Sequence, residues 1–197
     1  TGNAYTSGRA KHLLDLGLTA IARFERVLAR PLVERNRWPI HLRFSSDGTS
    51  VGWAASKTGA YLAINPSLEG PDLDYLFVEQ LARLVIADFL DKQASKVAYW
   101  IQELFVQWLT SSALYDFYPT AAVHEFHANR IQDYRCYKSG ACPARFDSDV
   151  ALADWSQDTQ DSTGSIKSLI LTLLLDASLG ANAMAQALGI FDSVIPD

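Results

Sequence analysis

The stretch from Leu76 to Leu90 constrains this chain most, because it is apolar on nearly every side of a helix. At about 100° per residue, Glu79, Gln80 and Arg83 share one strip, and Asp88 is the polar residue outside it. A helix that is apolar elsewhere is enclosed by protein. The strip therefore faces either solvent, as an i,i+4 pair of Glu79 and Arg83, or a cleft.

A second predicted helix, residues 94–114, carries one acid in an unusual position. Its main apolar face includes Trp100, Phe105 and Trp108. Glu103 lies roughly 130° from the centre of that face, with Val106 beyond it. Glu103 is therefore either a surface glutamate or a second residue of the same cleft.

The two stretches together resemble the metal-binding helices of gluzincins, a class of zincin zinc peptidases. Glu79 stands where the HExxH helix has its first histidine, Gln80 where it has the glutamate base, and Arg83 where it has the second histidine. The segment 99–109 resembles the helix that supplies the third ligand, and Glu103 takes the place of that ligand. The resemblance covers roughly residues 10 to 190.

The resemblance implies a peptidase fold that has lost its metal. Glu79, Gln80, Arg83 and Glu103 would be vestigial active-site positions, with no catalytic residue, no metal and no cofactor. A guanidinium between two carboxylates could occupy the volume of the zinc ion. It would not activate a water molecule as zinc does, and Gln80 cannot act as a base.

The order of predicted elements indicates an α+β fold of the zincin-like kind in a single domain, residues 1–197. A leading helix is expected over residues 9–35, a small mixed sheet over 38–64, and a helical bundle over 73–190. The resemblance implies that strand 60–64 is the edge strand beside the substrate cleft. The cleft would lie between this strand and helix 76–90.

Composition excludes some partners. The formal net charge is −5, and no concentrated basic face occurs, so nucleic-acid binding is not expected. No apolar run reaches the roughly 18 to 20 residues of a membrane span. The chain has the length of one domain with a substantial core.

Two cysteines, Cys136 and Cys142, flank a short segment that contains Gly140. Such a pair fits a disulfide in an oxidising compartment better than a metal site, which would need two more ligands. The alternative is two unlinked thiols. The disulfide predicts a periplasmic or secreted protein.

His124 and His127 offer a different chemistry. On a helix they share a face at i,i+3, so a divalent metal could bind there. No third ligand is evident in the sequence. The alternative function is therefore a metal-dependent hydrolase with a non-standard site around His124 and His127.

The favoured hypothesis is a non-catalytic pseudo-peptidase that acts as an exported binding or assembly module. A polypeptide or partner protein would lie in the former substrate cleft, by pairing with the edge strand. Candidate contacts are Trp53, Tyr61 and Tyr118. A purely structural domain whose likeness to zincins is accidental remains the third possibility.

Overall fold

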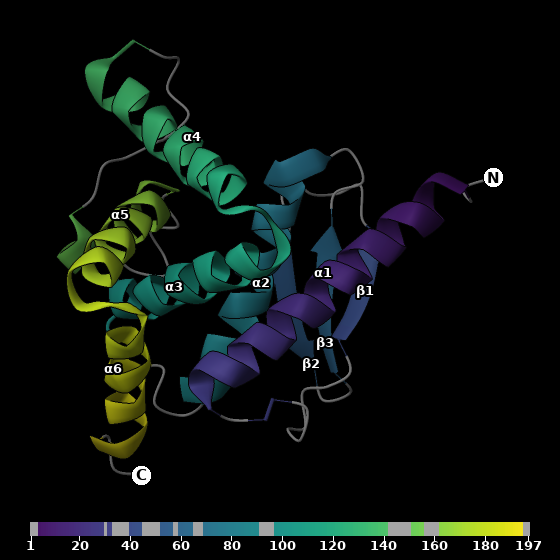
Figure 1. The fold of residues 1–197 in the computed structure, drawn as a ribbon, viewed down its shortest axis with the longest axis horizontal. Coiled ribbons are helices and arrows are strands. Elements are labelled where there is room, and N and C mark those ends of the chain that lie inside the picture. The colour runs from purple at the N-terminus through teal and green to yellow at the C-terminus, as the bar shows by residue number, and fades with distance from the viewer. Residues whose placement is uncertain are drawn as a thin grey trace.

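The computed structural model describes residues 4–29, 31–32, 40–44, 52–56, 59–64, 69–90, 97–141, 151–155 and 162–194. Figure 1 shows their arrangement. The helices are α1 (Ala4–Leu28), α2 (Gly70–Leu90), α3 (Tyr99–Phe117), α4 (Thr120–Ser139), α5 (Ser162–Leu179) and α6 (Ala181–Val194), with a short 3-10 turn, η2 (Leu152–Asp154). The strands are β1 (Ile40–Phe44), β2 (Gly52–Ser56) and β3 (Gly59–Ile64).

The expected α+β class is wrong, because the described part of the chain is mostly helical. Strand structure is confined to three short segments, β1, β2 and β3, beside a much larger helical body. The physical reason is that the long helices bury most of the apolar surface against one another. The short strands cover only one side of the helical body, so the sheet is a much smaller layer than the helices.

The order of the strands corrects a second expectation. The sheet order is β1-β3-β2, with β1 parallel and β2 antiparallel to β3. Both sides of β3 are therefore hydrogen-bonded, from Ile40↔Ala60 on one side to Trp53↔Leu62 on the other. The strand expected at the edge is the central strand, and it cannot accept an added peptide strand.

The expected cleft between β3 and α2 is filled by core side chains. Leu62 and Ile64 of β3 are buried in one cluster with Phe77 and Leu81 of α2. The space left beside them is an apolar pocket of about 180 Å³ that α1 also lines. The face of α2 that carries Arg83 is turned toward other helices instead.

The leading helix begins and ends earlier than expected. It covers Ala4–Leu28 rather than residues 9–35, and Ala29 adopts a positive φ of 50°. Glu25 then accepts a hydrogen bond from the backbone N–H of Leu32 at 2.8 Å. A left-handed residue and this side-chain contact end α1 before Pro31 is reached.

Helix α4 stands apart from the rest of the fold in Figure 1. Only Val123 and His127 of its described side chains are buried. It continues to Ser139, and Gly140 closes it at φ 68°. The described residues between α4 and α5 include η2, and α5 begins at Ser162.

Candidate functional site

Arg83 lies between the carboxylates of Glu79 and Glu103, as expected from the sequence. Arg83 Nη2 donates to Glu79 Oε1 at 3.1 Å, one turn away on α2. Glu103 faces them from α3 and accepts from Arg83 Nη1 and, at 2.5 Å, from Nη2. Glu79 and Glu103 are 3% and 1% exposed. The polar strip of α2 therefore takes part in a buried ion pair, in which Arg83 makes two hydrogen bonds with Glu103. It is not a solvated strip on the protein surface.

Neutral side chains complete the hydrogen bonds of the two acids. Gln107 Nε2 donates to Glu79 Oε1 at 2.7 Å and to Glu103 Oε1 at 2.9 Å. Ser165 of α5 donates to Glu103 Oε1 at 2.7 Å and accepts from Arg83 Nη2 at 3.1 Å. Buried charges are tolerated when they are hydrogen-bonded in this way.

Tyr75 ties the same cluster to the first turns of α2. Its hydroxyl donates to Gln107 Oε1 at 2.5 Å, so the amide of Gln107 is used at both ends. We call Tyr75, Glu79, Arg83, Glu103, Gln107 and Ser165 the Arg83 network. It joins α2, α3 and α5 through buried polar contacts.

Arg130 of α4 supplies a second cation. Its guanidinium carbon lies 4.3 Å from the centre of the Tyr75 ring, in a cation–π contact. Burial would lower the pKa of Arg130, but its neighbours Tyr75, Glu79 and Glu103 raise it. Two guanidinium groups thus face two carboxylates, and the assembly carries no net charge.

Burial and nearby charges shift the pKa values of three members of the network, Glu79, Arg83 and Tyr75. Burial would raise the pKa of Glu79, but Arg83, Arg130 and the hydrogen bond from Gln107 outweigh it and keep that pKa below its usual range. Burial would lower the pKa of Arg83, and the two acids raise it further than burial lowers it. Burial is also the main cause of the raised pKa of Tyr75. None of these three groups titrates near neutral pH, as a general acid or base would.

Two aromatic rings cover one side of the network. Tyr99 lies close enough to Arg83 for the guanidinium to act on its pKa, and Trp155 packs edge-on against Tyr99 with ring centres 4.8 Å apart. Trp155 is 5% exposed and lies over Gly164, where a Cβ would come within 2.1 Å of its Cε2. Gly164 therefore permits Trp155 to close this side.

Metal ligands do not gather in the described residues. Within those ranges, no group of three or more His, Cys, Asp or Glu side chains could hold a metal ion. In the Arg83 network the centre between the acids is taken by the guanidinium of Arg83. A divalent cation would have to displace that group.

A groove between α2 and α4 leads to the network. It has a volume of about 540 Å³, and Tyr75 and Arg130 line it. Asp72, Glu125 and Asp133 lie along the same groove, so three carboxylates border it. The groove therefore joins these acids to buried Tyr75 and half-buried Arg130.

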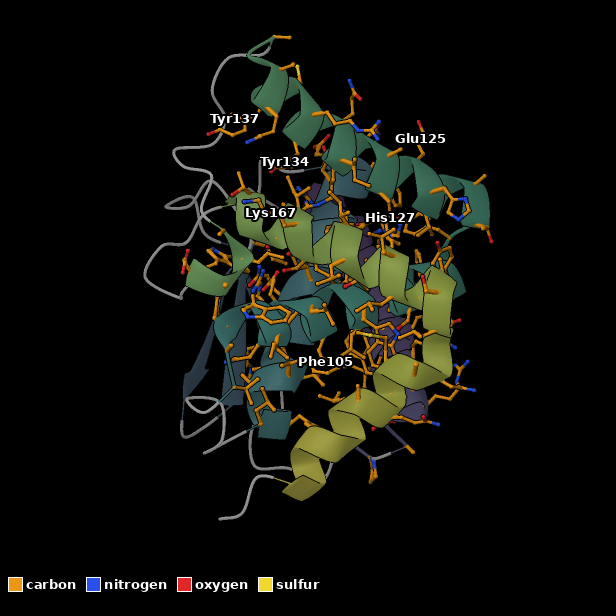
Figure 2. All side chains as sticks on the ribbon, turned by 90° about the vertical axis from the view of Figure 1, so that its left-hand side faces the viewer. Phe105, Glu125, His127, Tyr134, Tyr137 and Lys167 are labelled. Atoms are coloured by element: carbon orange, nitrogen blue, oxygen red, sulfur yellow. The ribbon has the colours of Figure 1, made fainter. Side chains whose placement is uncertain are left out.

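The two histidines of the alternative site lie in different environments. His127 is buried and its Nε2 lies 3.1 Å from Ser111 Oγ, whereas His124 is exposed. Figure 2 shows His127 where α4 passes α5. Burial, with smaller effects of His124 and Arg130, lowers the pKa of His127 to about 4. His127 is thus a neutral partner of Ser111, and one of its two nitrogens is already used.

The other sequence candidates take no part in the network. Gln80 is half-buried and is absent from the described contacts of Arg83. Tyr118 is half-buried and donates to Asp74, which also bonds His12 Nε2 at 2.7 Å. The side chains of Trp53 and Tyr61 lie outside the described residues, as does Cys142. The pairing of Cys142 with Cys136, in the last turn of α4, stays a prediction.

Sequence reasoning missed Tyr75, Gln107, Ser165, Arg130 and the cover formed by Trp155. One signal was available for two of them. Tyr75, Glu79 and Arg83 follow one another at four-residue spacing on α2, and Tyr99, Glu103, Gln107 and Ser111 do so on α3. Polar residues at this spacing share one helix face, so two such series in apolar helices indicate a polar contact between them.

Comparison with models of protein families, with curated proteins and with solved structures finds no match for this chain. No single described helix has the length and hydropathy to cross a membrane. One bent pair, Thr163–Leu179 with Asn182–Gly189, meets that criterion by length and composition across a 110° bend.

Proposed function

We propose that this chain is a non-catalytic, peptidase-like binding module, exported to the periplasm or beyond the cell. The observation that carries the proposal is the Arg83 network. A cation, Arg83, bridges two buried acids from two helices, and in our proposal it takes the place of the metal of a zincin. Arg83 has the positive charge for such a bridge but cannot act as a Lewis acid.

The gluzincin resemblance is part of this proposal. It rests on the meeting of Glu79 and Arg83 with Glu103, which the spacing along the chain led us to expect. The electroneutral sum of Arg83, Arg130 and the two acids supports the idea that two guanidinium groups replace a dication. In this proposal the network stabilises the helices around it, and the function lies at the protein surface.

The binding surface we propose is the groove between α2 and α4. Strand addition to β3 is excluded by its two neighbours, β1 and β2. The groove lies beside the network, and Asp72, Glu125 and Asp133 border it. Carboxylates at a rim attract cationic partners and speed their association. The expected partner is a polypeptide segment that carries lysine or arginine side chains.

Fluorescence anisotropy tests this binding with two labelled ten-residue peptides of equal length, one built from Lys, Ala and Leu and the other from Glu, Ala and Leu. The basic peptide is expected to bind, and the acidic peptide is not. Glu125→Lys should weaken the binding of the basic peptide, since the side chain of Glu125 is exposed and lines the groove. The matched control is Asp15→Lys, an exposed acid on α1. Equal loss in both variants would indicate non-specific attraction to the net negative charge.

A further inference from the structure

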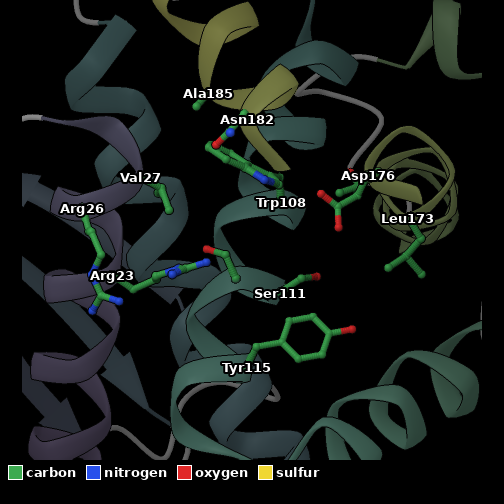
Figure 3. A pocket seen from close by; sticks show the side chains of 12 residues that line it. Arg23, Arg26, Val27, Trp108, Ser111, Tyr115, Leu173, Asp176, Asn182 and Ala185 are labelled. Atoms are coloured by element: carbon green, nitrogen blue, oxygen red, sulfur yellow. The ribbon is translucent and has the colours of Figure 1, made fainter. Parts of the chain in front are cut away.

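A second pocket lies on the other side of α3, and no residue of the Arg83 network lines it. It has a volume of about 280 Å³ and is formed by side chains of α1, α3, α5 and α6. Figure 3 shows Arg23 reaching into it from α1 and Asp176 entering from α5, above Ser111 and Tyr115. A pocket enclosed by four helices is built by the fold rather than by a surface loop.

Two side chains of opposite charge line this pocket, Arg23 from α1 and Asp176 from α5. Among the described contacts no ion pair joins them to each other. Each also has a buried polar atom, Arg23 Nε and Asp176 Oδ1, that has no partner among the described residues. A ligand that contacts both side chains must present an acceptor to Arg23 and a donor to Asp176.

The charges of the pocket limit the occupant further. Arg23 and Arg26 share one carboxylate, that of Asp116, at 3.7 Å and 3.3 Å. These long contacts leave one positive charge in excess, and Asp176 contributes the balancing negative charge. Burial and the charge of Asp176 raise the pKa of Tyr115, which lines the same pocket. A ligand without net charge but with two charged ends therefore fits best.

The size and the apolar wall are those of a small molecule. Trp108, Val27, Leu173 and Ala185 give the pocket an apolar side. Its volume is several times the roughly 30 Å³ that one water molecule occupies in the liquid. An apolar side chain has room there while its charged ends reach the two helices.

We propose that this pocket binds a free α-amino acid with an aliphatic side chain, with its carboxylate on Arg23 and its ammonium group on Asp176. A guanidinium is suited to a carboxylate, and the carboxylate of Asp176 is suited to an ammonium donor. The side chain packs against Trp108 and Leu173. This site is independent of the groove between α2 and α4.

Isothermal titration of the whole chain with three probes of one carbon skeleton tests the proposal. L-Leucine carries both charged ends, L-leucinamide lacks the carboxylate, and 4-methylpentanoate lacks the ammonium group. Each missing charged hydrogen bond should weaken binding at least about tenfold. If leucine does not bind, the other amino acids are titrated to about 10 mM. The proposal is overturned if none of them binds. Equal affinity for leucine and 4-methylpentanoate also overturns it.

Variants then locate the binding. Asp176→Asn should weaken the binding of the amino acid at least about tenfold and leave the affinity for 4-methylpentanoate unchanged. Asp15→Asn, at an exposed acid on α1 that lines neither the pocket nor the groove, is the matched control and should change neither. Amino-acid binding that survives Asp176→Asn places the ligand elsewhere and contradicts the inference. Should this variant not fold, the comparison of the three probes on the unaltered chain still decides.

Discussion

Arg83 faces Glu103 end-on across the interface of α2 and α3, and both terminal nitrogens of the guanidinium donate to the two carboxylate oxygens. The same Nη2 also contacts Glu79 and Ser165. One cation thus links three helices. Removal of this cation should lower the stability of the fold strongly, because the two buried acids would then be left unpaired.

Arg83→Met removes this cation at similar volume and leaves two buried carboxylates facing each other. Breaking a buried ion pair costs about 3–5 kcal/mol of the free energy of unfolding. Urea denaturation measures the change. The control is Lys11→Met, which removes the exposed Lys11–Asp15 pair, and an exposed pair is worth at most about 1 kcal/mol. Equal costs for the two variants would contradict the burial of the network.

The stability of the protein should fall as pH decreases from about 6.5 toward 4, because of His127. The pKa of His127 is lowered from 6.5 to about 4 in the fold, so the unfolded chain takes up a proton in this window before the folded chain does. The slope is at most about 1.4 kcal/mol per pH unit. Urea denaturation across this range measures it.

His127→Gln should flatten that slope, and His124→Gln, on the exposed side of α4, should leave most of it. Below about pH 4.5 the lowered pKa of Glu79 adds a second loss, since its carboxylate must then be protonated. A slope between pH 6.5 and 4.5 that persists in His127→Gln would assign the effect to other groups.

Gly164→Ala should displace Trp155 from the cover of the network. The new methyl group would lie 2.1 Å from Trp155 Cε2, and overpacking of this kind costs about 1–3 kcal/mol. Gly189→Ala is the control, because nothing lies within 4 Å of its added Cβ, and this change should stabilise α6 slightly. In a Trp155→Ala background the cost at Gly164 should vanish, and a cost that persists would mean another clash.

We predict that Cys136 and Cys142 are bonded to each other when the protein folds in an oxidising compartment. The closed loop is short, so it removes little entropy from the unfolded chain and stabilises only modestly. Thiol titration under denaturing, non-reducing conditions measures the pairing. Two reactive thiols in protein purified from an oxidising compartment would rule it out.

The sequence predicted most helices and the central contact, because apolar periodicity and the i,i+4 spacing are local signals. The helix faces alone left open a solvated Glu79–Arg83 pair and a surface Glu103, and it was the gluzincin resemblance that brought the three residues together. Strand order could not be obtained this way, and the expected edge strand, β3, lies in the centre of the sheet. The share of helical structure was also underestimated. Which elements pack against one another is decided by tertiary packing rather than by the sequence of any one segment.

Other parts of the site depended on contacts between distant segments. Ser165, Arg130 and Trp155 come from α4, α5 and the segment between them, and no local pattern marks them as neighbours of Glu103. Gln107 is different, because it lies one turn from Glu103 on the same helix. Its four-residue spacing was visible in the sequence.

Zinc content measured by elemental analysis, with peptide cleavage assayed on the same samples, tests the central claim most directly. The unaltered chain should hold no stoichiometric zinc and cleave no peptide. The triple variant Glu79→His, Gln80→Glu, Arg83→His should bind about one equivalent together with Glu103 if the frame is that of a gluzincin. One equivalent of zinc in the unaltered chain, removed by a chelator with loss of a peptidase activity, would contradict the account.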